Sequence, residues 1–223
     1  MEKQEKLVSF DKLMIQLQYI SQGKTPKEHL VNIGEVCEAG GKWVQLRLKN
    51  VDHATYLKTA LECRNICDQY EAIMIINDNV GVAKAALADG VHLGLKDMNP
   101  IEARKVLGDN FIIGGTANTL EDCKKQMIDG VDYIGLGPFR YTTTKENLSP
   151  VLGLEGYKKI LSEFSIQHSE IPVIAIGGIE VADMPEILKT GIDGFAVSGM
   201  LTGQDDLEEK IQQIKKLITK VNG

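Results

Sequence analysis

Residues 72–94 read AIMIINDNVGVAKAALADGVHLG, and this stretch contains the pattern that decides the predicted fold. Short aliphatic runs at 72–76 and 91–93 lack the alternation of apolar and polar residues that a half-exposed strand shows. Such runs are typical of strands buried on both faces, as in a parallel sheet. Gly90 ends the helical stretch between them, where a left-handed cap is expected. The stretch therefore predicts a strand, a helix and a second, parallel strand.

The same alternation of strand and helix signals extends along the chain. Amphipathic stretches separate the aliphatic runs, and the clearest one keeps helical spacing from Leu207 to Val221. About eight such units fit into 223 residues, with no linker rich in proline, glycine or serine between them. We therefore predict an α/β protein, a single (β/α)8 TIM barrel over residues 1–223, with an open doubly wound sheet as the alternative. The predicted strands are Met14–Ile20, Trp43–Leu48, Ala72–Ile76, Val91–Leu93, Phe111–Gly114, Val131–Gly135, Pro172–Ile176 and Gly194–Val197.

Several helix boundaries can also be predicted. Thr25 is a candidate N-cap, with Pro26 at the first helical position and Glu28 as the acidic partner of a capping box. The other candidates are Asn99 and Thr119 as N-caps, and Gly130 and Gly191 as left-handed C-caps.

The composition excludes several classes of protein. Lysine and arginine total 25 and aspartate and glutamate total 31, which gives a net charge of −6. Apolar residues make up 43% and charged residues 25%, as in ordinary globular proteins, so we exclude disordered and collagen-like chains. An acidic chain lacks the basic face that a general nucleic-acid binder needs, although clustered cations can still hold a small phosphorylated ligand. No aliphatic run approaches the roughly 20 residues of a membrane helix. We expect neither nucleic acid nor membrane as a partner.

The cysteines and the N-terminus predict a cytoplasmic protein. The first residues, MEKQEKLVSFDK, are charged throughout and do not resemble a signal peptide. Cys63 and Cys67 lie four residues apart, as zinc ligands on a helix could, but they continue an apolar helix face with Tyr56 and Ala60. We interpret both as small core residues. Unpaired cysteines without a secretion signal are typical of a reducing compartment.

Polar side chains gather where the predicted strands end, which is where a TIM barrel builds its site. Gln45, Arg47 and Lys49 alternate along the second predicted strand, so we expect them to point to one side and converge. A solvated strand end is the alternative. Three polar residues on one face of an otherwise apolar strand favour a binding site.

Two aspartates follow neighbouring predicted strands. Asp78 comes directly after Asn77 at the end of the third strand, and Asp97 follows the fourth. Two carboxylates at one rim suit Mg²⁺, which takes one or two of them and leaves its other positions to water and substrate phosphate. The alternative is that either aspartate caps the next helix. His92 lies within an apolar run, and we interpret it as a hydrogen-bonded core residue rather than a ligand.

The later strand ends carry residues that suit anions. The sixth strand runs into GPFRYTTTK at 137–145, where three threonines and Lys145 form a candidate phosphate clamp, with a plain surface loop as the alternative. The pairs Gly-Gly at 177–178 and Ser-Gly at 198–199 follow the last two strands. This fold often binds phosphate there, through backbone N–H groups and a helix N-terminus. We therefore predict two anion sites on one rim, one for a pyrophosphate-like group and one for a monophosphate.

Five motifs of the chain together resemble the thiamine-phosphate synthase family. They are VQLRLK at 44–49, IND at 76–78, DGVHLG at 89–94, DYIGLGPFRYTTTK at 132–145 and IPVIAIGGI at 171–179. The resemblance implies a transferase of thiamine biosynthesis built on a TIM barrel. It would join 4-amino-2-methyl-5-(diphosphooxymethyl)pyrimidine to thiazole phosphate, release pyrophosphate and use Mg²⁺ as its cofactor.

The resemblance also implies a role for each matched residue. Asp78 and Asp97 would hold Mg²⁺. Three cations, Arg47, Lys49 and Lys145, would act catalytically by neutralising charge on the departing pyrophosphate. The pyrimidine diphosphate would contact Gln45, Arg47, Lys49, Asn77, Thr116 and Lys145, and the thiazole phosphate would contact Thr142, Thr144, one of Gly177 and Gly178, Ser198 and Gly199.

Four positions depart from the pattern that the family often shows. Leu95 replaces a glutamine, Thr116 and Gly199 each replace a serine, and Asn118 replaces a histidine. A thiazole tautomerase on the same scaffold, or a non-catalytic ligand-binding barrel, is the alternative function. The tautomerase is expected to use a histidine where Asn118 lies, and the retained aspartates and loop lysine favour the synthase. A homo-oligomer is compatible with the sequence.

Overall fold

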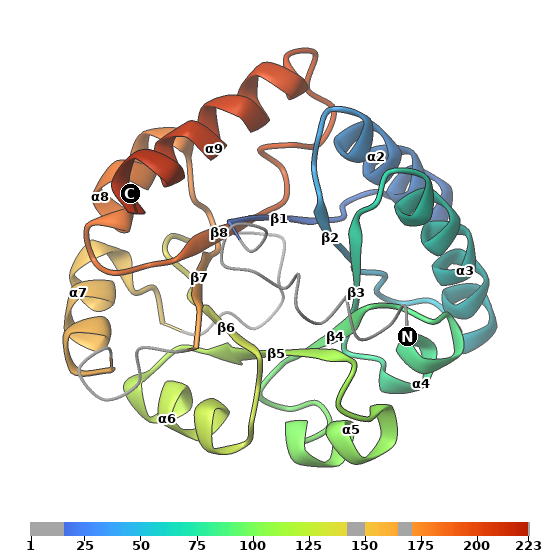
Figure 1. Ribbon diagram of the computed structural model, residues 1–223, viewed down its shortest axis with the longest axis horizontal. Coiled ribbons are helices and arrows are strands. Elements are labelled where there is room, and N and C mark those ends of the chain that lie inside the picture. The colour runs from blue at the N-terminus through green and yellow to red at the C-terminus, as the bar shows by residue number, and fades with distance from the viewer. Residues whose placement is uncertain (1–15, 142–149, 165–170, 223) are drawn as a thin grey trace.

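Eight parallel strands close into a barrel in which each strand pairs with the next and β8 pairs with β1 (Figure 1). The structure, a computed structural model, describes residues 16–141, 150–164 and 171–222. This closure confirms the predicted TIM barrel and excludes the open doubly wound sheet. The strands are β1 (Leu17–Ile20), β2 (Trp43–Leu46), β3 (Ile73–Asn77), β4 (Gly90–Leu93), β5 (Ile112–Ala117), β6 (Tyr133–Leu136), β7 (Val173–Ile176) and β8 (Gly194–Val197).

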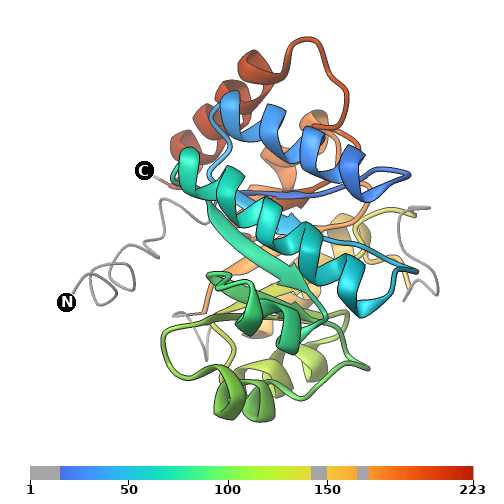
Figure 2. The same cartoon turned by 90° about the vertical axis from the view of Figure 1, so that its right-hand side faces the viewer.

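Helices surround the barrel and connect successive strands (Figure 1). In the side view of Figure 2, α2 and α3 lie next to each other along the outside of the barrel. The described helices are α2 (Pro26–Glu38), α3 (His53–Gln69), α4 (Val80–Ala85), α5 (Pro100–Leu107), α6 (Leu120–Ile128), α7 (Gly153–Phe164), the 3-10 turn η1 (Val181–Asp183), α8 (Met184–Leu188) and α9 (Leu207–Asn222).

The helix starts agree with the sequence, with one difference. Thr25 Oγ1 accepts from the backbone N of Glu28 at 3.2 Å, and Pro26 begins α2. The predicted capping box at this helix is wrong, because the Glu28 carboxylate accepts from the backbone N of Lys24 instead, at 2.7 Å. Asn99 and Thr119 are N-caps as predicted, and Thr119 forms a full capping box with Asp122.

Two of the three predicted glycine caps are confirmed. Gly130 and Gly191 have φ angles of +75° and +95°. The cap predicted at Gly90 is wrong, because Leu87 takes the left-handed conformation there, with φ +53°. Gly90 is instead the first residue of β4, and a Cβ on it would lie 2.3 Å from the backbone oxygen of Ile112. This glycine is needed for the close approach of β5.

Aspartates at the start of three even-numbered strands tie each of them to the strand before. Each carboxylate accepts from a backbone N of that strand: Asp89 from Met74 (2.8 Å), Asp132 from Ile113 (2.6 Å) and Asp193 from Val173 (2.8 Å). Arg64 pairs with Asp89 at 2.6 Å, and Arg104 pairs with Asp132 at 2.7 Å. These contacts hold the amino-terminal end of the barrel, opposite the strand ends that carry the candidate site.

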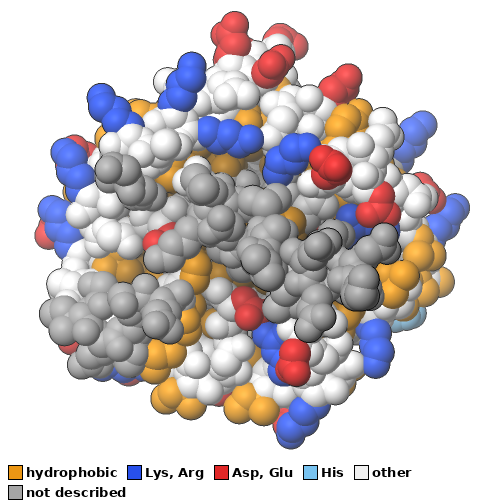
Figure 3. Space-filling model, in the orientation of Figure 1, with side chains coloured by type: hydrophobic (Ala, Val, Ile, Leu, Met, Phe, Trp, Pro, Cys, Tyr) orange, Lys and Arg blue, Asp and Glu red, His pale blue; other side chains and the backbone are white. Residues whose placement is uncertain are grey.

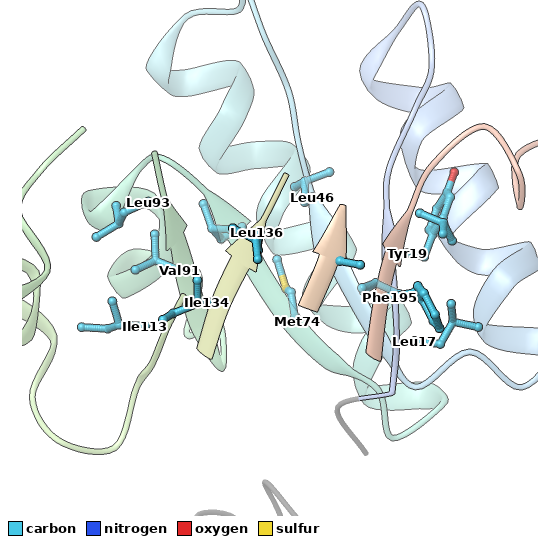
Figure 4. Packing of buried hydrophobic residues seen from close by; sticks show 14 of the residues in the cluster. Leu17, Tyr19, Leu46, Met74, Val91, Leu93, Ile113, Ile134, Leu136 and Phe195 are labelled. Carbon is cyan, nitrogen blue, oxygen red and sulfur yellow. The ribbon is translucent and has the colours of Figure 1, made fainter. Parts of the chain in front are cut away.

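The apolar core has two parts. Side chains that point outward from the strands, among them Leu46, Met74 and Val91, pack between the sheet and the helices (Figure 4). A smaller cluster fills the barrel interior and consists of Ile20, Trp43, Ile75, Tyr133, Ile174 and Ala196. Side chains alternate along a strand, so Gln45 and Asn77, which lie two residues beyond Trp43 and Ile75, also face the interior.

Cys63 and Cys67 are core residues, as predicted, and the other two cysteines are buried as well. All four are buried and free, and the sulfur atoms of Cys63 and Cys67 are 4.0 Å apart. Within the described part of the chain, no group of three or more His, Cys, Asp or Glu side chains is placed to hold a metal ion. None of the helices over the described residues is long and apolar enough to cross a membrane. Acidic and basic side chains are interspersed on the face that Figure 3 shows.

Candidate active site

Two amides point into the barrel interior near the carboxyl ends of the strands. Gln45 is 2% exposed, and its Nε2 has no hydrogen-bond partner among the described residues. Asn77 is also buried, and its backbone oxygen accepts from the Tyr56 hydroxyl at 2.9 Å, which fixes the end of β3. A buried donor without a partner is unfavourable, so the Gln45 amide has capacity for a ligand.

The structure brings Asp78 and Asp97 together at the ends of β3 and β4. Their carboxylates are hydrogen-bonded to each other, and the Lys49 ammonium forms an ion pair with Asp78. Asp78 has φ +64°, and its backbone N donates to the His92 oxygen at 2.8 Å. Neither aspartate caps a helix, because Asn79 and Asn99 are the N-caps of α4 and α5.

The pKa values of the two carboxylates are shifted in opposite directions. Burial, the hydrogen bond with Asp78 and the charge of Asp78 raise the pKa of Asp97 to about 6. Burial also acts to raise the pKa of Asp78, but hydrogen bonds from Asp97 and Lys49 outweigh it and lower that pKa. Asp97 is therefore the carboxylate of the pair that takes up a proton first as the pH falls toward 6. A divalent cation that prefers oxygen ligands would offset the repulsion between the two carboxylates, so the residues present fit Mg²⁺.

The loop after β4 holds Asp97 in place. Its Oδ2 accepts from the backbone N of Gly94 at 2.6 Å, and a Cβ on Gly94 would lie 2.8 Å from that oxygen. A side chain at this position would displace the carboxylate. Gly94, the last residue of the DGVHLG motif, therefore leaves space for the carboxylate of Asp97, three residues later.

Arg47 follows β2, and its backbone is held by a hydrogen bond to the buried Ser21. Its backbone N donates to Ser21 Oγ at 2.9 Å, and Ser21 Oγ lies 2.7 Å from His29 Nδ1. Burial lowers the pKa of His29, and the positive charge of Arg47 lowers it further. The base of Arg47 is therefore held by β1 and α2, while its side chain is only half-buried.

Thr116 lies across the interior from these cations. Its Oγ1 is 3.0 Å from His92 Nε2, and His92 is 8% exposed. His92 is therefore a hydrogen-bonded core residue, as predicted from the sequence.

The glycine pair after β7 is shaped by a residue that the sequence analysis passed over. Gly177 and Gly178 have φ angles of +95° and +66°. Arg140 donates from its backbone N to Gly177 O at 2.9 Å and from its guanidinium to Gly178 O at 2.6 Å. The guanidinium also pairs with both carboxylate oxygens of Asp183, at 3.0 and 2.9 Å. No spacing or composition signal in the sequence points to Arg140 and Asp183 as partners.

The segment after β8 differs from the expectation in one respect. A turn over 198–203 follows the strand, and α9 begins only at Leu207, so no regular helix begins at Ser198 and Gly199. After β7, the turn η1 begins at Val181 and continues into the short helix α8. The small residues remain, and Ser198 Oγ donates to Gln22 Oε1 at 3.3 Å. Backbone N–H groups of tight turns can still bind an anion here.

Asn118 has a structural role. Its amide nitrogen donates to Gly137 O and Pro150 O, both at 2.9 Å, so it holds together the two sides of the loop that follows β6. The predicted site residues Thr142, Thr144 and Lys145 belong to that loop and lie outside the described residues.

Comparisons with known proteins identify the family. Residues 17–201 match the family model described as thiamine monophosphate synthase. A thiamine-phosphate synthase of Flavobacterium psychrophilum is 50% identical over 200 residues, covering 90% of this chain and 97% of that relative. The chain belongs to the thiamine monophosphate synthase family. It is therefore an enzyme with thiamine-phosphate synthase activity, which makes it a transferase acting on small-molecule substrates.

Other members of the thiamine monophosphate synthase family agree over nearly their full length. A thiamine-phosphate synthase of Bacteroides fragilis is 47% identical over 201 residues, covering 90% of this chain and 98% of the relative. The solved structure of thiamine phosphate pyrophosphorylase from Pyrococcus furiosus has a TM-score of 0.81 at 32% identity, covering 95% of this chain and 99% of that chain.

Proposed function

We propose that the enzyme joins 4-amino-2-methyl-5-(diphosphooxymethyl)pyrimidine to thiazole phosphate with Mg²⁺ bound by Asp78 and Asp97. The observation that carries this proposal is the carboxylate pair at the ends of β3 and β4, with Lys49 paired to Asp78. Mg²⁺, when bound, supplies positive charge close to the phosphate groups of the substrate.

The cations around this pair would bind the pyrophosphate. Arg47 and Lys49 follow the end of β2, close in sequence to Gln45, and Lys145 would join them from the loop after β6. As the bond between the methylene carbon and the phosphate oxygen breaks, both electrons leave with the pyrophosphate. These cations would stabilise the growing negative charge. We propose Arg47, Lys49 and Lys145 as the catalytic residues.

The amides and Thr116 would position the pyrimidine. Gln45 has an unused buried donor, Asn77 ends the neighbouring strand, and Thr116 presents a hydroxyl across the interior. The thiazole nitrogen would then donate its lone pair to the methylene carbon and form the new C–N bond. This route needs orientation and electrostatic stabilisation rather than a strong base.

The thiazole phosphate would bind at the later strands. Gly177, Gly178, Ser198 and Gly199 offer backbone N–H groups with little side-chain bulk, and Thr142 and Thr144 would add hydroxyls. We further propose that the enzyme acts in the cytoplasm, without nucleic-acid or membrane partners.

The test is a reaction of the purified protein with both substrates and Mg²⁺, followed by separate quantification of thiamine phosphate and pyrophosphate. We expect the two products in equal amounts and a strict requirement for the divalent cation. Conversion of thiazole phosphate alone into an isomer would indicate a tautomerase instead. The use of the Asn118 amide as a structural donor to Gly137 and Pro150 favours the synthase. Binding of both ligands without products would indicate a non-catalytic barrel.

A further inference from the structure

A chain of buried polar groups leads from the middle of the barrel to Thr116. Gln18 Nε2 donates to the Tyr133 hydroxyl at 3.3 Å, that hydroxyl is 3.0 Å from His92 Nδ1, and His92 Nε2 is 3.0 Å from Thr116 Oγ1. We propose that Gln18, Tyr133 and His92 are positioning residues that fix the Thr116 hydroxyl as a hydrogen-bond donor to the substrate. This inference rests on the proposed function, in which Thr116 contacts the pyrimidine.

The direction of the chain follows from the chemistry of its members. The Tyr133 oxygen accepts from Gln18, so its own hydrogen is available for His92 Nδ1. Burial raises the pKa of Tyr133, which keeps the phenol protonated and able to donate. An imidazole nitrogen that accepts a hydrogen bond carries no hydrogen, so when Tyr133 donates to Nδ1 the ring hydrogen of His92 lies on Nε2, which donates to Thr116 Oγ1. The hydroxyl hydrogen of Thr116 is then left to point at a ligand.

The neighbouring strands leave room for this arrangement. A Cβ on Gly114 would lie 2.2 Å from Tyr133 Cζ and 2.5 Å from His92 Nδ1. A Cβ on Gly135 would lie 3.0 Å from His92 Cε1. The ring centroids of His92 and Tyr133 are 5.4 Å apart. The two glycines therefore make the space in which the rings meet, and the pair has little freedom to rearrange.

The consequence is selectivity for an acceptor atom. A threonine hydroxyl can donate or accept, but one that already accepts from His92 is best used as a donor. A ring nitrogen with a lone pair, as in an aminopyrimidine, meets this requirement. A ligand that offers an N–H group at the same place would meet an oxygen whose acceptor capacity is already in use.

The test combines four single variants, the double variant Tyr133→Phe/Thr116→Val and two readouts. Tyr133→Phe keeps the ring and removes the donor to His92, while Thr116→Val removes the final hydroxyl and Thr116→Ser keeps it. Tyr157→Phe is the matched control, because Tyr157 is an equally buried tyrosine whose hydroxyl donates to Leu136 O at 2.8 Å, outside the chain. The readouts are the KM of each substrate and the tautomer of His92, measured by two-bond ¹H–¹⁵N correlation on histidine-labelled protein.

In the wild type we expect the Nε2–H tautomer of His92, and in Tyr133→Phe we expect a shift toward Nδ1–H. The KM for the pyrimidine diphosphate should rise roughly three- to tenfold in Tyr133→Phe and Thr116→Val, the loss expected for one neutral hydrogen bond. The double variant should be no worse than Thr116→Val, because both changes remove the same interaction. Tyr157→Phe should stay near the wild type, Thr116→Ser should recover most of the loss seen in Thr116→Val, and the KM for thiazole phosphate should not change.

The proposal is overturned if the rises in KM of the two single variants multiply in the double variant. It is also overturned if His92 of the wild type is the Nδ1–H tautomer. If Tyr133→Phe melts well below the wild type, Gln18→Leu interrupts the chain from another strand and should shift the same tautomer. The tautomer is measured without substrates. If the wild type forms no product but His92 is the Nε2–H tautomer, the proposed function is refuted. The proposed direction of the hydrogen bonds from Gln18 to Thr116 then still holds.

Discussion

Arg140 and Asp183 form a two-point ion pair between the segment after β6 and the turn after β7, with Nη1–Oδ2 3.0 Å and Nη2–Oδ1 2.9 Å. The same guanidinium donates to Gly178 O, and Asp183 Oδ2 also accepts from the backbone N of Glu180 at 2.8 Å. One side chain therefore supports the conformation of the glycine turn and joins it to the segment that enters the threonine-rich loop.

From this pair we predict that Arg140→Ala raises the KM for thiazole phosphate by roughly tenfold, because the turn loses its brace and the N–H groups lose their alignment. The KM for the pyrimidine diphosphate should stay within about twofold. Arg140→Lys should recover only part of the loss, since an ammonium lacks the planar two-point geometry. The control is Lys189→Ala, at an exposed cation that is the C-cap of α8 and is paired with Glu186. Equal losses for both substrates in Arg140→Ala would contradict the prediction.

Removing either carboxylate of the pair should weaken the binding of Mg²⁺. We expect Asp78→Asn and Asp97→Asn each to raise the Mg²⁺ concentration for half-maximal activity by roughly tenfold or more, because an anionic oxygen ligand is lost. Asp109→Asn, at an exposed aspartate, is the control. Unchanged Mg²⁺ titrations in both site variants would show that the metal binds elsewhere.

Gly178→Val should selectively damage the thiazole phosphate site. Gly178 has φ +66°, and a Cβ there would lie 3.0 Å from both Arg140 Cβ and Arg140 O. The valine would therefore push the turn away from Arg140 and fill the space of the anion. We expect a large rise in the KM for thiazole phosphate and a nearly unchanged KM for the pyrimidine diphosphate.

A variant at a second glycine shows whether the kinetic effect of Gly178→Val comes from backbone strain or from the contact with Arg140. Gly130 has φ +75°, and among the described residues, its two chain neighbours aside, no atom would lie within 4 Å of a Cβ added there. Gly130→Val should lose stability by about 1–2 kcal/mol, the cost of a side chain in the left-handed region, and should keep both KM values. The two variants are compared by thermal unfolding and by separate substrate titrations. A similar kinetic defect in both would assign the effect to strain alone.

The amino-terminal end of the barrel allows a stability prediction. Asp89 is paired with Arg64 at 2.6 Å, and the side chains are 14% and 11% exposed. Asp89→Ala leaves Arg64 without this partner and the backbone N of Met74 without its acceptor. We expect the free energy of unfolding to fall by about 3–5 kcal/mol. Glu155→Ala removes an exposed partner of Lys158 and should change it by less than about 0.5 kcal/mol. Urea unfolding measures both, and equal midpoints would contradict the prediction.

The strand pattern could be predicted because burial on both faces leaves a local trace. Runs such as Ala72–Ile76 and Pro172–Ile176 are apolar without alternation, and each contains the observed strand or most of it. Helix caps such as Thr119 could also be predicted from nearby residues, since the threonine hydroxyl accepts a hydrogen bond from a backbone N three residues away. The cap at Gly90 was wrong because its glycine is required by a contact with Ile112, and a contact between strands leaves no local trace.

Some features of the candidate site could be predicted from the sequence, and others could not. The order of the strands and the positions of polar residues at their ends were enough to place Asp78 beside Asp97, and the structure brings them into contact. The roles of Arg140, Asn118 and Tyr133 could not be found this way. Their partners are Asp183, Pro150 and His92, which lie 43, 32 and 41 residues away.

The sequence by itself determined which segments become strands, where several helices begin and which rim carries the carboxylates and cations. These properties depend on burial pattern and on contacts within one turn, both of which can be read locally. Only the tertiary structure decided which carboxylate of the pair has the raised pKa, how the glycine turn is braced and which buried side chains form the contacts from Gln18 to Thr116. Those properties depend on distances between side chains from different strands, and the distances exist only once the barrel has closed.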